Sequence, residues 1–405
     1  MDIRQSVLLL AGEFPPFKGG IARVADHLAT GLVDRGHEVT VFAPRMGQEG
    51  ETAARRRRTA EDGLRTPDQG LGTAGGSLVV RRFPLSRLRS VRMLPTLPFV
   101  LGHYARHAPD VCLALRCTRE GILANLNRRI TGTPYITFAY GTEFLRYPPG
   151  SRRGRMVRRI IDESARTFCI SEFTRRALAE RGCSPDRLSV MCPGIDRLPT
   201  NLPGQEKARD RLNLHGGPVL LSVSRLVPHK GHDTVLRALP RLRSRWSGLQ
   251  YVVVGKGVHE AALRQLAQAV GVAEAVRFVG YVPDGDLASY YAACDVFVMP
   301  SRDEGGSVEG FGISFLEAAA HGRPAIGGRG TGAEDAIADG VTGVLVDPYS
   351  AEAVAEGIAK LLGDEPLRKQ MGVAARARVE SDFSWERAVA TVERVLMEAA
   401  TVGRP

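Results

Sequence analysis

The 405-residue sequence has no long apolar run, few aromatic residues and no paired cysteine motif. A helix needs about 20 consecutive apolar residues to span a bilayer, so we predict no transmembrane helix. The six cysteines show neither a C-x-x-C pair nor a Cys/His spacing typical of metal sites, and we interpret them as reduced, mostly buried thiols. The composition is 43% hydrophobic and 24% charged, which excludes disordered, collagen-like and disulfide-stapled chains.

The start of the chain also lacks the features of a secretory signal. Its apolar run, Val7–Ala11, is short and is followed by the acidic Glu13, whereas a signal peptide has a longer apolar region and a small-residue cleavage site. We therefore expect a cytoplasmic protein. At roughly 100–200 residues per domain, the length predicts two domains of similar size.

The net charge of +11 is unevenly distributed, with +13 in residues 1–200 and −2 in residues 201–405. Most of the excess is arginine, for example in 55–58 and 152–159. A basic half suits phosphate-bearing substrates, lipid headgroups or nucleic acid; the alternative is a set of solvated faces without a partner. Arginines 87, 89 and 92 next to the apolar stretch 93–100 also suit peripheral contact with an anionic membrane at its inner face, or packing of that stretch on the core.

Apolar runs and helical patterns alternate along the chain. The run 6–11, the glycines Gly19 and Gly20, a helical pattern over 21–32 and a strand at 39–42 form a βαβ unit, which implies a parallel sheet. Residues 46–77 lack apolar periodicity and predict a mobile surface loop. Further strands are predicted at 111–117, 134–140, 167–171, 188–194, 218–226, 249–255, 276–282, 296–301, 323–328 and 343–347.

This alternation predicts an α/β protein with two Rossmann-like, doubly wound domains facing a central cleft. We place the N-terminal, acceptor-binding domain at 1–195, a linker at 196–214 and a C-terminal, nucleotide-sugar-binding domain at 215–384. Ligands of such sheets bind beyond the carboxyl ends of the strands.

The segment 301–328 is the richest in candidate ligand-binding residues. It follows a predicted strand, and we expect a helix to open at about Phe311, where glycines and free amides suit a close anion. Glu309 and Glu317 would lie about 12 Å apart along a helix axis. They could bind hydroxyls at opposite ends of a nucleotide sugar, or they are ordinary surface charges.

Two cations and a glycine pair add to this candidate site. Arg225 and Lys230 flank a proline turn after a strand and could neutralise a diphosphate. Gly19 and Gly20 precede a helix, whose amides could reach the same phosphates. Each feature alone has an ordinary structural explanation, but together they indicate a nucleotide-sugar site.

In these motifs the sequence resembles the family 4 glycosyltransferases of the GT-B fold, over nearly the whole chain. Its second half is most similar to phosphatidylinositol-mannoside mannosyltransferases. The motifs occur in order: Gly19-Gly20-Ile21, Arg225…Lys230-Gly231, Glu309-Gly310-Phe311-Gly312…Glu317-Ala318 and Asp382-Phe383-Ser384-Trp385.

The resemblance implies a retaining, metal-independent hexosyltransferase without a cofactor. The hexose would pass from GDP-mannose or a UDP-hexose to an acceptor hydroxyl, and a last helix, about 385–405, would pack back on the first domain. Arg225, Lys230 and Glu309 would be the catalytic residues: the two cations would contact the diphosphate, and Glu309 the sugar. The remaining donor contacts would be Gly19, Gly20, Val282, Phe311, Gly312, Ile313 and, for the ribose, Glu317.

The sequence also departs from the family pattern. Tyr140-Gly141-Thr142-Glu143 has tyrosine where the family often has histidine, and Tyr140 and Glu143 become candidates for acceptor or sugar contacts. The family's G-G-x-P-E loop reads Thr331 to Asp335 here. Residues 46–105 match no known acceptor motif, so an anionic lipid, a phosphorylated acceptor and a neutral natural product all stay open.

The sequence supports three alternative functions less well: a metal site, a nucleic-acid-binding module and a nicotinamide-dependent enzyme. Asp284-Gly285-Asp286 resembles a D-x-D metal motif, but we interpret Asp286 as a helix N-cap and predict no metal. A nucleic-acid-binding module would need stacking aromatics beside its arginines, so we expect no nucleic-acid partner. A nicotinamide enzyme would need a full glycine fingerprint, and the segment 255–257 has only part of one.

Overall fold

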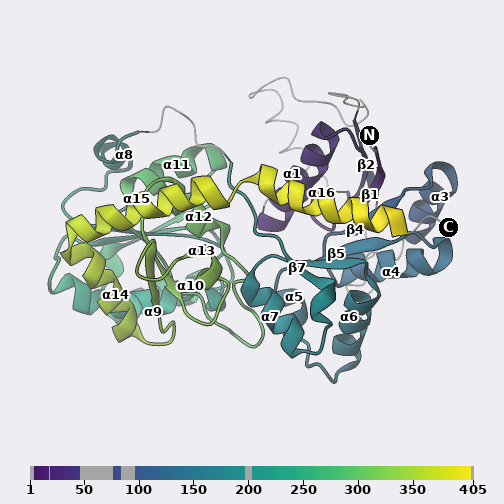
Figure 1. Cartoon of the computed structure of the whole chain (residues 1–405). Helices are drawn as coiled ribbons and strands as arrows, with labels where there is room; N and C mark the ends of the chain where they lie inside the picture. Colours follow the sequence, from purple (N-terminus) through teal and green to yellow (C-terminus); the bar gives the residue numbers. More distant parts are fainter. Residues whose placement is uncertain (1–3, 18, 46–75, 84–95, 197–202, 403–405) are drawn as a thin grey trace. The chain divides into compact units, whose positions relative to one another are not determined.

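The computed structural model describes residues 4–17, 19–45, 76–83, 96–196 and 203–402, and the chain forms two compact units (Figure 1). The first unit comprises residues 1–170, 174–193 and 385–405, and the second comprises 171–173 and 194–384. Within these described ranges, each unit contains one sheet whose strands are all parallel, with helices between them. The predicted doubly wound α/β class is therefore confirmed.

The sheet of the first unit has, in the described residues, seven strands in the order β3-β2-β1-β4-β5-β6-β7. The chain proceeds outward from β1 in one direction and then from β4 in the other. Ligands of doubly wound sheets bind beyond the strand ends at such a reversal. The elements are β1 (Ser6–Leu10), α1 (Gly20–Asp34), β2 (Glu38–Pro44), β3 (Ser77–Phe83), α3 (Leu97–His107), β4 (Val111–Ala114), α4 (Arg119–Thr131), β5 (Tyr135–Ala139), α5 (Thr142–Leu145), α6 (Arg152–Glu163), β6 (Arg166–Cys169), α7 (Glu172–Glu180), β7 (Leu188–Val190) and α16 (Trp385–Val402).

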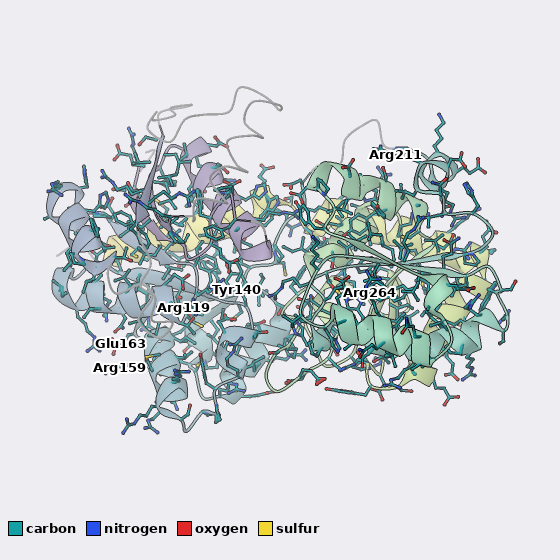
Figure 2. All side chains as sticks on the ribbon, turned by 180° about the vertical axis from the view of Figure 1, so that it is seen from behind. Arg119, Tyr140, Arg159, Glu163, Arg211 and Arg264 are labelled. Atoms are coloured by element: carbon teal, nitrogen blue, oxygen red, sulfur yellow. The ribbon has the colours of Figure 1, made fainter. Side chains whose placement is uncertain are left out.

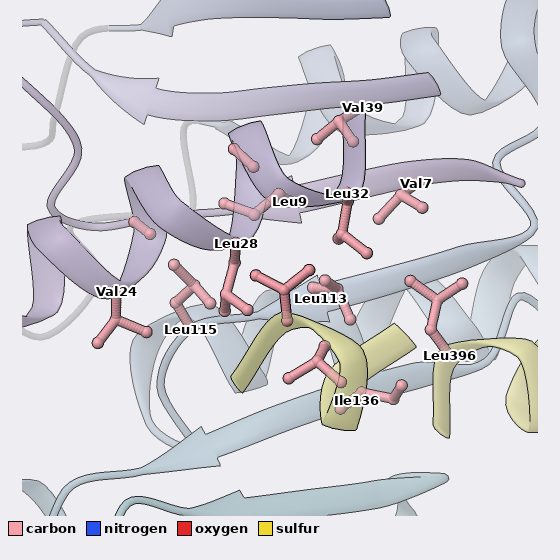
Figure 3. Packing of buried hydrophobic residues seen from close by; sticks show 14 of the residues in the cluster. Val7, Leu9, Val24, Leu28, Leu32, Val39, Leu113, Leu115, Ile136 and Leu396 are labelled. Carbon is pink, nitrogen blue, oxygen red and sulfur yellow. The ribbon is translucent and has the colours of Figure 1, made fainter. Parts of the chain in front are cut away.

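The strands of this sheet are apolar because both faces are covered. Alternate residues of β1 enter different clusters: Val7 and Leu9 pack with α1 and α16, and Leu8 packs with α3 and α4. Figure 3 shows the first cluster, in which Leu28 and Leu396 come from the two helices. A side chain at Gly31 would place its Cβ 2.6 Å from Cγ2 of Val389, so this glycine lets α16 approach α1 closely.

The second unit is built in the same way around a sheet with the order β10-β9-β8-β11-β12-β13. Helices α9 and α14 contribute Val235 and Ile358 to the core on one face. On the other face, the Phe297 ring of β11 lies 5.5 Å from that of Phe315 in α12. The elements are α8 (Gln205–Leu212), β8 (Val219–Val223), α9 (His232–Arg243), β9 (Gln250–Val254), α10 (Glu260–Ala269), β10 (Val276–Gly280), α11 (Asp284–Ala293), β11 (Val296–Met299), α12 (Ile313–Ala320), β12 (Ala325–Gly328), α13 (Ala333–Ala336), β13 (Gly343–Val346), α14 (Ala351–Gly363) and α15 (Glu365–Asp382).

Two sequence expectations differ from the structure. Strand β3 was not predicted, because Arg81 and Arg82 interrupt its apolar pattern, yet it pairs along its whole length with β2. The segment expected to be a linker, 196–214, contains helix α8, which packs against α11 in the second unit. Residues 46–75 and 84–95, with the arginine clusters at 55–58 and 87–92, lie outside the described residues.

Two further expectations concern membrane spans and thiols. In the described parts of the chain, none of the helices combines the length and apolar character needed to cross a membrane. All six cysteines are free thiols, and Cys192 is the one that is not fully buried. The interpretation of reduced, mostly buried cysteines agrees with this.

We expect Leu396→Ala to destabilise the first unit by about 2–5 kcal/mol, because it removes a buried side chain and leaves a cavity between α1, α16 and the sheet. Ile130→Ala is the control, since Ile130 is 57% exposed. Denaturant unfolding monitored by far-UV circular dichroism would measure both. Equal stability of the two variants would contradict the packing role of α16.

Candidate active site

Two loops at the carboxyl end of the second sheet carry the predicted catalytic residues. The loop from β8 to α9 contains a short 3₁₀ turn, Pro228–Lys230, which ends at Gly231 with a φ of 73°. A Cβ on Gly231 would lie 2.1 Å from the Pro300 carbonyl oxygen. Glycine is therefore required there, and its backbone brings the Lys230 loop against the start of the β11–α12 loop.

The β11–α12 loop ends later than the sequence suggested. Gly312 has a φ of 92°, and helix α12 starts at Ile313 rather than at about Phe311. Glu309 therefore precedes the helix, and Glu317 lies on it. The expected 12 Å spacing along one helix axis is wrong, because the left-handed glycine separates the two carboxylates into different elements.

The two loops are joined by an ion pair between the Lys230 ammonium and the Glu309 carboxylate. Both side chains are largely buried, with 12% and 13% of their surface exposed. Burial raises the pKa of Glu309, but the charge and hydrogen bond of Lys230, together with smaller contributions from His229 and the Phe311 amide, outweigh it, so the net pKa is below its usual range. Glu309 is thus an ionised carboxylate with its cation beside it.

A third loop fixes the backbone at Glu309. The Gly332 amide donates to the Glu309 carbonyl at 2.8 Å. A Cβ on Gly332 would lie only 2.0 Å from the Gly310 carbonyl oxygen. The loop 331–335, which departs from the family pattern, therefore still packs directly on the glutamate loop and leaves room for no side chain at 332.

Arg302 is a supporting residue that the sequence analysis missed. It is 8% exposed, and its guanidinium donates to both carboxylate oxygens of Asp233, at 3.0 and 3.1 Å. Its amide also donates to the His229 carbonyl at 2.9 Å. Arg302 thus connects the β11–α12 loop to the beginning of α9. Nothing in the sequence indicates this pair, because the arginine follows one strand and the aspartate lies in the first turn of a helix that is far away in the chain.

A buried polar network fixes the two ends of the β8–α9 loop, which carries Lys230. Nε2 of His232 lies 2.9 Å from Oγ of Ser224, and its Nδ1 lies 2.9 Å from the Tyr251 hydroxyl. Burial lowers the pKa of His232 to about 3, so the imidazole is neutral at physiological pH. A neutral ring can donate at one nitrogen and accept at the other, which suits a fixed link between β8, β9 and α9.

The remaining predicted donor residues lie in this unit as well. Arg225 is on the same loop as Lys230 and is exposed, with no ion pair in the described part of the chain. Val282 follows β10 and is buried. The Tyr291 hydroxyl donates to Oε2 of Glu317 at 2.6 Å. The ring of Phe311 packs edge-on against Phe383.

Four predicted residues belong to the first unit instead. Gly19 precedes α1 with a φ of 145°, and Gly20 is the first residue of that helix. After β5, Oε1 of Glu143 accepts a hydrogen bond from the Tyr140 amide at 2.5 Å. The Tyr140 hydroxyl is buried and has no hydrogen-bond partner among the described residues. The ligand contacts of all four stay predictions.

The D-x-D segment is part of a helix. Helix α11 starts at Asp284, so Asp286 lies in its first turn and not at its N-cap as expected, and it pairs with Arg211 at 3.3 Å. Within the described ranges, no group of three or more His, Cys, Asp or Glu side chains is arranged to hold a metal ion.

Sequence comparisons now decide the family. The family model "Glycosyltransferase Family 4" matches residues 18–197, and "Glycosyl transferases group 1" matches 204–378. A "GDP-mannose-dependent alpha-(1-6)-phosphatidylinositol monomannoside mannosyltransferase" of Mycobacterium tuberculosis is 32% identical, over 94% of this chain and 95% of that protein. The chain belongs to glycosyltransferase family 4.

Solved structures show the same fold for this glycosyltransferase. Sucrose-phosphate synthase from Thermosynechococcus elongatus superimposes with a TM-score of 0.79 at 22% identity, over 98% of this chain and all of that one. Anabaena Alr3699/HepE, solved with UDP and glucose, gives a TM-score of 0.76 at 19% identity, over 97% of this chain and 100% of that one. The expected GT-B class is confirmed.

We expect Arg302→Met to destabilise the second unit by about 3–5 kcal/mol, because it leaves Asp233 without its buried partner. The control is Arg329→Met, which breaks the exposed Arg329–Asp339 pair and should cost at most about 1 kcal/mol. Chemical unfolding of both variants measures this difference. Similar losses would show that Arg302 does not hold the two loops together.

Tyr140→Phe separates a packing role from a ligand contact. Removing a buried hydroxyl without a partner should stabilise the protein by about 1–3 kcal/mol. If the hydroxyl binds substrate, the same variant should lose turnover while its melting temperature rises. A more stable variant with unchanged kinetics would assign Tyr140 to packing alone.

Proposed function

We propose that this glycosyltransferase is a retaining, metal-independent mannosyltransferase that uses GDP-mannose and a mannosylated, lipid-linked acceptor. The observation that carries the proposal is the buried contact between Lys230 and Glu309 at the carboxyl end of the second sheet. The two side chains lie next to each other, and in the proposal the cation binds a donor phosphate while the carboxylate accepts hydrogen bonds from the sugar hydroxyls.

The chemistry explains why the cations matter. The bond between the anomeric carbon and the β-phosphate oxygen of the donor breaks, and a bond from that carbon to the acceptor oxygen forms. Negative charge therefore grows on the leaving nucleoside diphosphate. Lys230 and Arg225 would stabilise it, together with the amides at the start of α12. Glu309 would then share the Lys230 ammonium with the diphosphate and accept hydrogen bonds from the sugar.

Retention of configuration is proposed through transfer on one face of the sugar. In that route the acceptor hydroxyl approaches beside the leaving phosphate, and its proton passes to a phosphate oxygen. The family resemblance supports this route, and it assigns no protein carboxylate the part of a covalent nucleophile. Glu309, ionised and paired with Lys230, suits orientation of the sugar.

The donor and acceptor are proposed from the relatives. The Mycobacterium relative is named for GDP-mannose and phosphatidylinositol monomannoside, and its similarity extends over 94% of this chain. A D-inositol 3-phosphate glycosyltransferase of Corynebacterium aurimucosum is 33% identical over 58% of this chain and 57% of that protein. UDP-hexoses are the competing donors, because UDP is bound in the structurally similar HepE.

Helix α6 supports peripheral attachment to a membrane that contains the acceptor. Arg152, Arg153 and Arg155 of this helix are exposed, while Val157 and Ile160 are buried against the unit. Each such arginine near an anionic surface contributes about 1 kcal/mol. Binding at the cytoplasmic leaflet would bring a soluble donor and a lipid acceptor to the same enzyme.

The proposal is tested by mannosyl transfer from GDP-mannose to phosphatidylinositol monomannoside in vesicles, with EDTA present. Lys230→Ala and Arg225→Ala should each lower turnover by about 10²–10³-fold. Arg264→Ala is the matched control, since this exposed arginine lies on α10 and pairs with Glu260 (Figure 2). Near-normal turnover in the first two variants would remove both cations from the site. Inversion at the anomeric carbon, or transfer only from a UDP-hexose, would overturn the proposed reaction.

A further inference from the structure

A buried tyrosine of the second unit, which the proposed reaction does not use, contacts a predicted donor residue. Tyr291 lies on α11, and its hydroxyl donates to Oε2 of Glu317 on α12 at 2.6 Å. This length is typical of a hydroxyl that donates to an ionised carboxylate, which is a stronger bond than one between neutral groups. Because the contact joins two helices that follow different strands, β10 and β11, it fixes the Glu317 side chain from outside its own helix.

Packing against two other rings holds the Tyr291 hydroxyl in place. The tyrosine ring is buried, lies 6.0 Å from that of Phe297 in β11 and stacks at 5.3 Å on that of His321, which directly follows α12. The Arg323 guanidinium also donates to the Ala292 carbonyl at 2.7 Å, so the ends of α11 and α12 are joined. Close packing leaves the ring little freedom, and its hydroxyl is therefore a fixed anchor for the carboxylate.

His321 supports the tyrosine as an uncharged ring. Its Nδ1 lies 2.8 Å from the Glu317 carbonyl oxygen, and because a carbonyl only accepts hydrogen bonds, Nδ1 carries the proton. Burial lowers the pKa of His321, and the hydrogen bond to this carbonyl does not offset the shift. A neutral imidazole stacks on the phenol without drawing the Glu317 carboxylate away from it.

Glu317 gains from such an anchor as a ligand for hydroxyls. The residue is half-buried, and a glutamate side chain without an anchor loses rotamer freedom when it binds a ligand, which lowers the affinity. A carboxylate offers about four acceptor sites, so one bond from Tyr291 fixes the group without exhausting its capacity. The 2′- and 3′-hydroxyls of a ribose are adjacent donors, which a carboxylate held in this way can bind together.

Resting on the proposed function, we propose that Tyr291 is a positioning residue, which orients Glu317 toward the donor ribose. It thereby sets the preference of the site for ribonucleotides over nucleotides that lack the 2′- and 3′-hydroxyls. The ribose is remote from the bond that breaks, so its binding energy acts equally on the ground state and the transition state. Loss of the Tyr291 hydroxyl should therefore raise KM for GDP-mannose and leave kcat nearly unchanged.

The test measures the dissociation constants of GDP and 2′,3′-dideoxy-GDP for the full chain by isothermal titration calorimetry. The parent protein should prefer GDP by about 10- to 100-fold, as expected for hydrogen bonds to a charged group. Tyr291→Phe should weaken GDP binding by about 3- to 10-fold. It should leave the binding of 2′,3′-dideoxy-GDP unchanged, because only the ribose contact depends on the orientation of Glu317.

A double-mutant cycle measures whether Tyr291 acts through Glu317. Glu317→Ala should lose most of the preference for GDP, and adding Tyr291→Phe should then have no further effect on either nucleotide. The control is Tyr135→Phe, because Tyr135 is also a buried tyrosine whose hydroxyl donates to a main-chain carbonyl, but it belongs to the first unit. It should bind both nucleotides like the parent protein. Thermal melting of each variant checks that it is folded.

Three results would overturn the positioning role. They are an unchanged preference for GDP in Tyr291→Phe, an equal loss of affinity for both nucleotides, and an effect of Tyr291→Phe that persists in the Glu317→Ala background. Equal binding of the two nucleotides by the parent protein would overturn it as well, since Glu317 would then bind no ribose. In all these cases GDP still binds, and the proposed function is not affected. If neither GDP nor UDP binds the parent protein, the proposed function itself is wrong.

Discussion

The ion pair between Lys230 and Glu309 is the contact on which the rest of the candidate active site depends. It joins two loops that leave neighbouring strands, β8 and β11, and it keeps the Glu309 carboxylate ionised in a largely buried place. Ions in such surroundings are costly unless they are paired. The surrounding groups, Arg302 with Asp233 and the neutral His232, are therefore arranged to fix the positions of the loops.

The two units differ in how their cations are paired with carboxyl groups. In the second unit, whose half of the sequence is nearly neutral, each cation near the candidate site is matched locally or lies exposed, as Arg225 does. The first half of the sequence has an excess of arginine, yet Arg116, which follows β4, interacts with three carboxyl groups, those of Glu13, Glu120 and Glu143. Overall charge indicates which partners approach a surface, whereas the local set of donors and acceptors decides which chemical group binds at a strand edge.

Periodicity predicted most of this fold, and its failures have physical causes. Buried parallel strands such as Val219–Val223 and Val296–Met299 are short apolar runs that need no context to be recognised. Strand β3 carries Arg81 and Arg82 and was missed. The start of α12 was misplaced because the left-handed Gly312 cannot be distinguished from a helical glycine in sequence. Arg302, Arg116 and Glu120 were missed because their partners are distant in the chain, and no pattern of residue types encodes such pairs.

The central claim is that the second unit binds a nucleoside diphosphate, and thermal-shift measurements with GDP, UDP, ADP and NAD at matched concentrations test it most directly. A ligand that binds only the native state raises its apparent stability by mass action. With EDTA present, we predict stabilisation by GDP that exceeds the effect of the other three and is lost in Lys230→Ala. The account would be contradicted if GDP and UDP stabilised the protein equally, not at all or only with Mg²⁺. Stabilisation by NAD alone would contradict it as well.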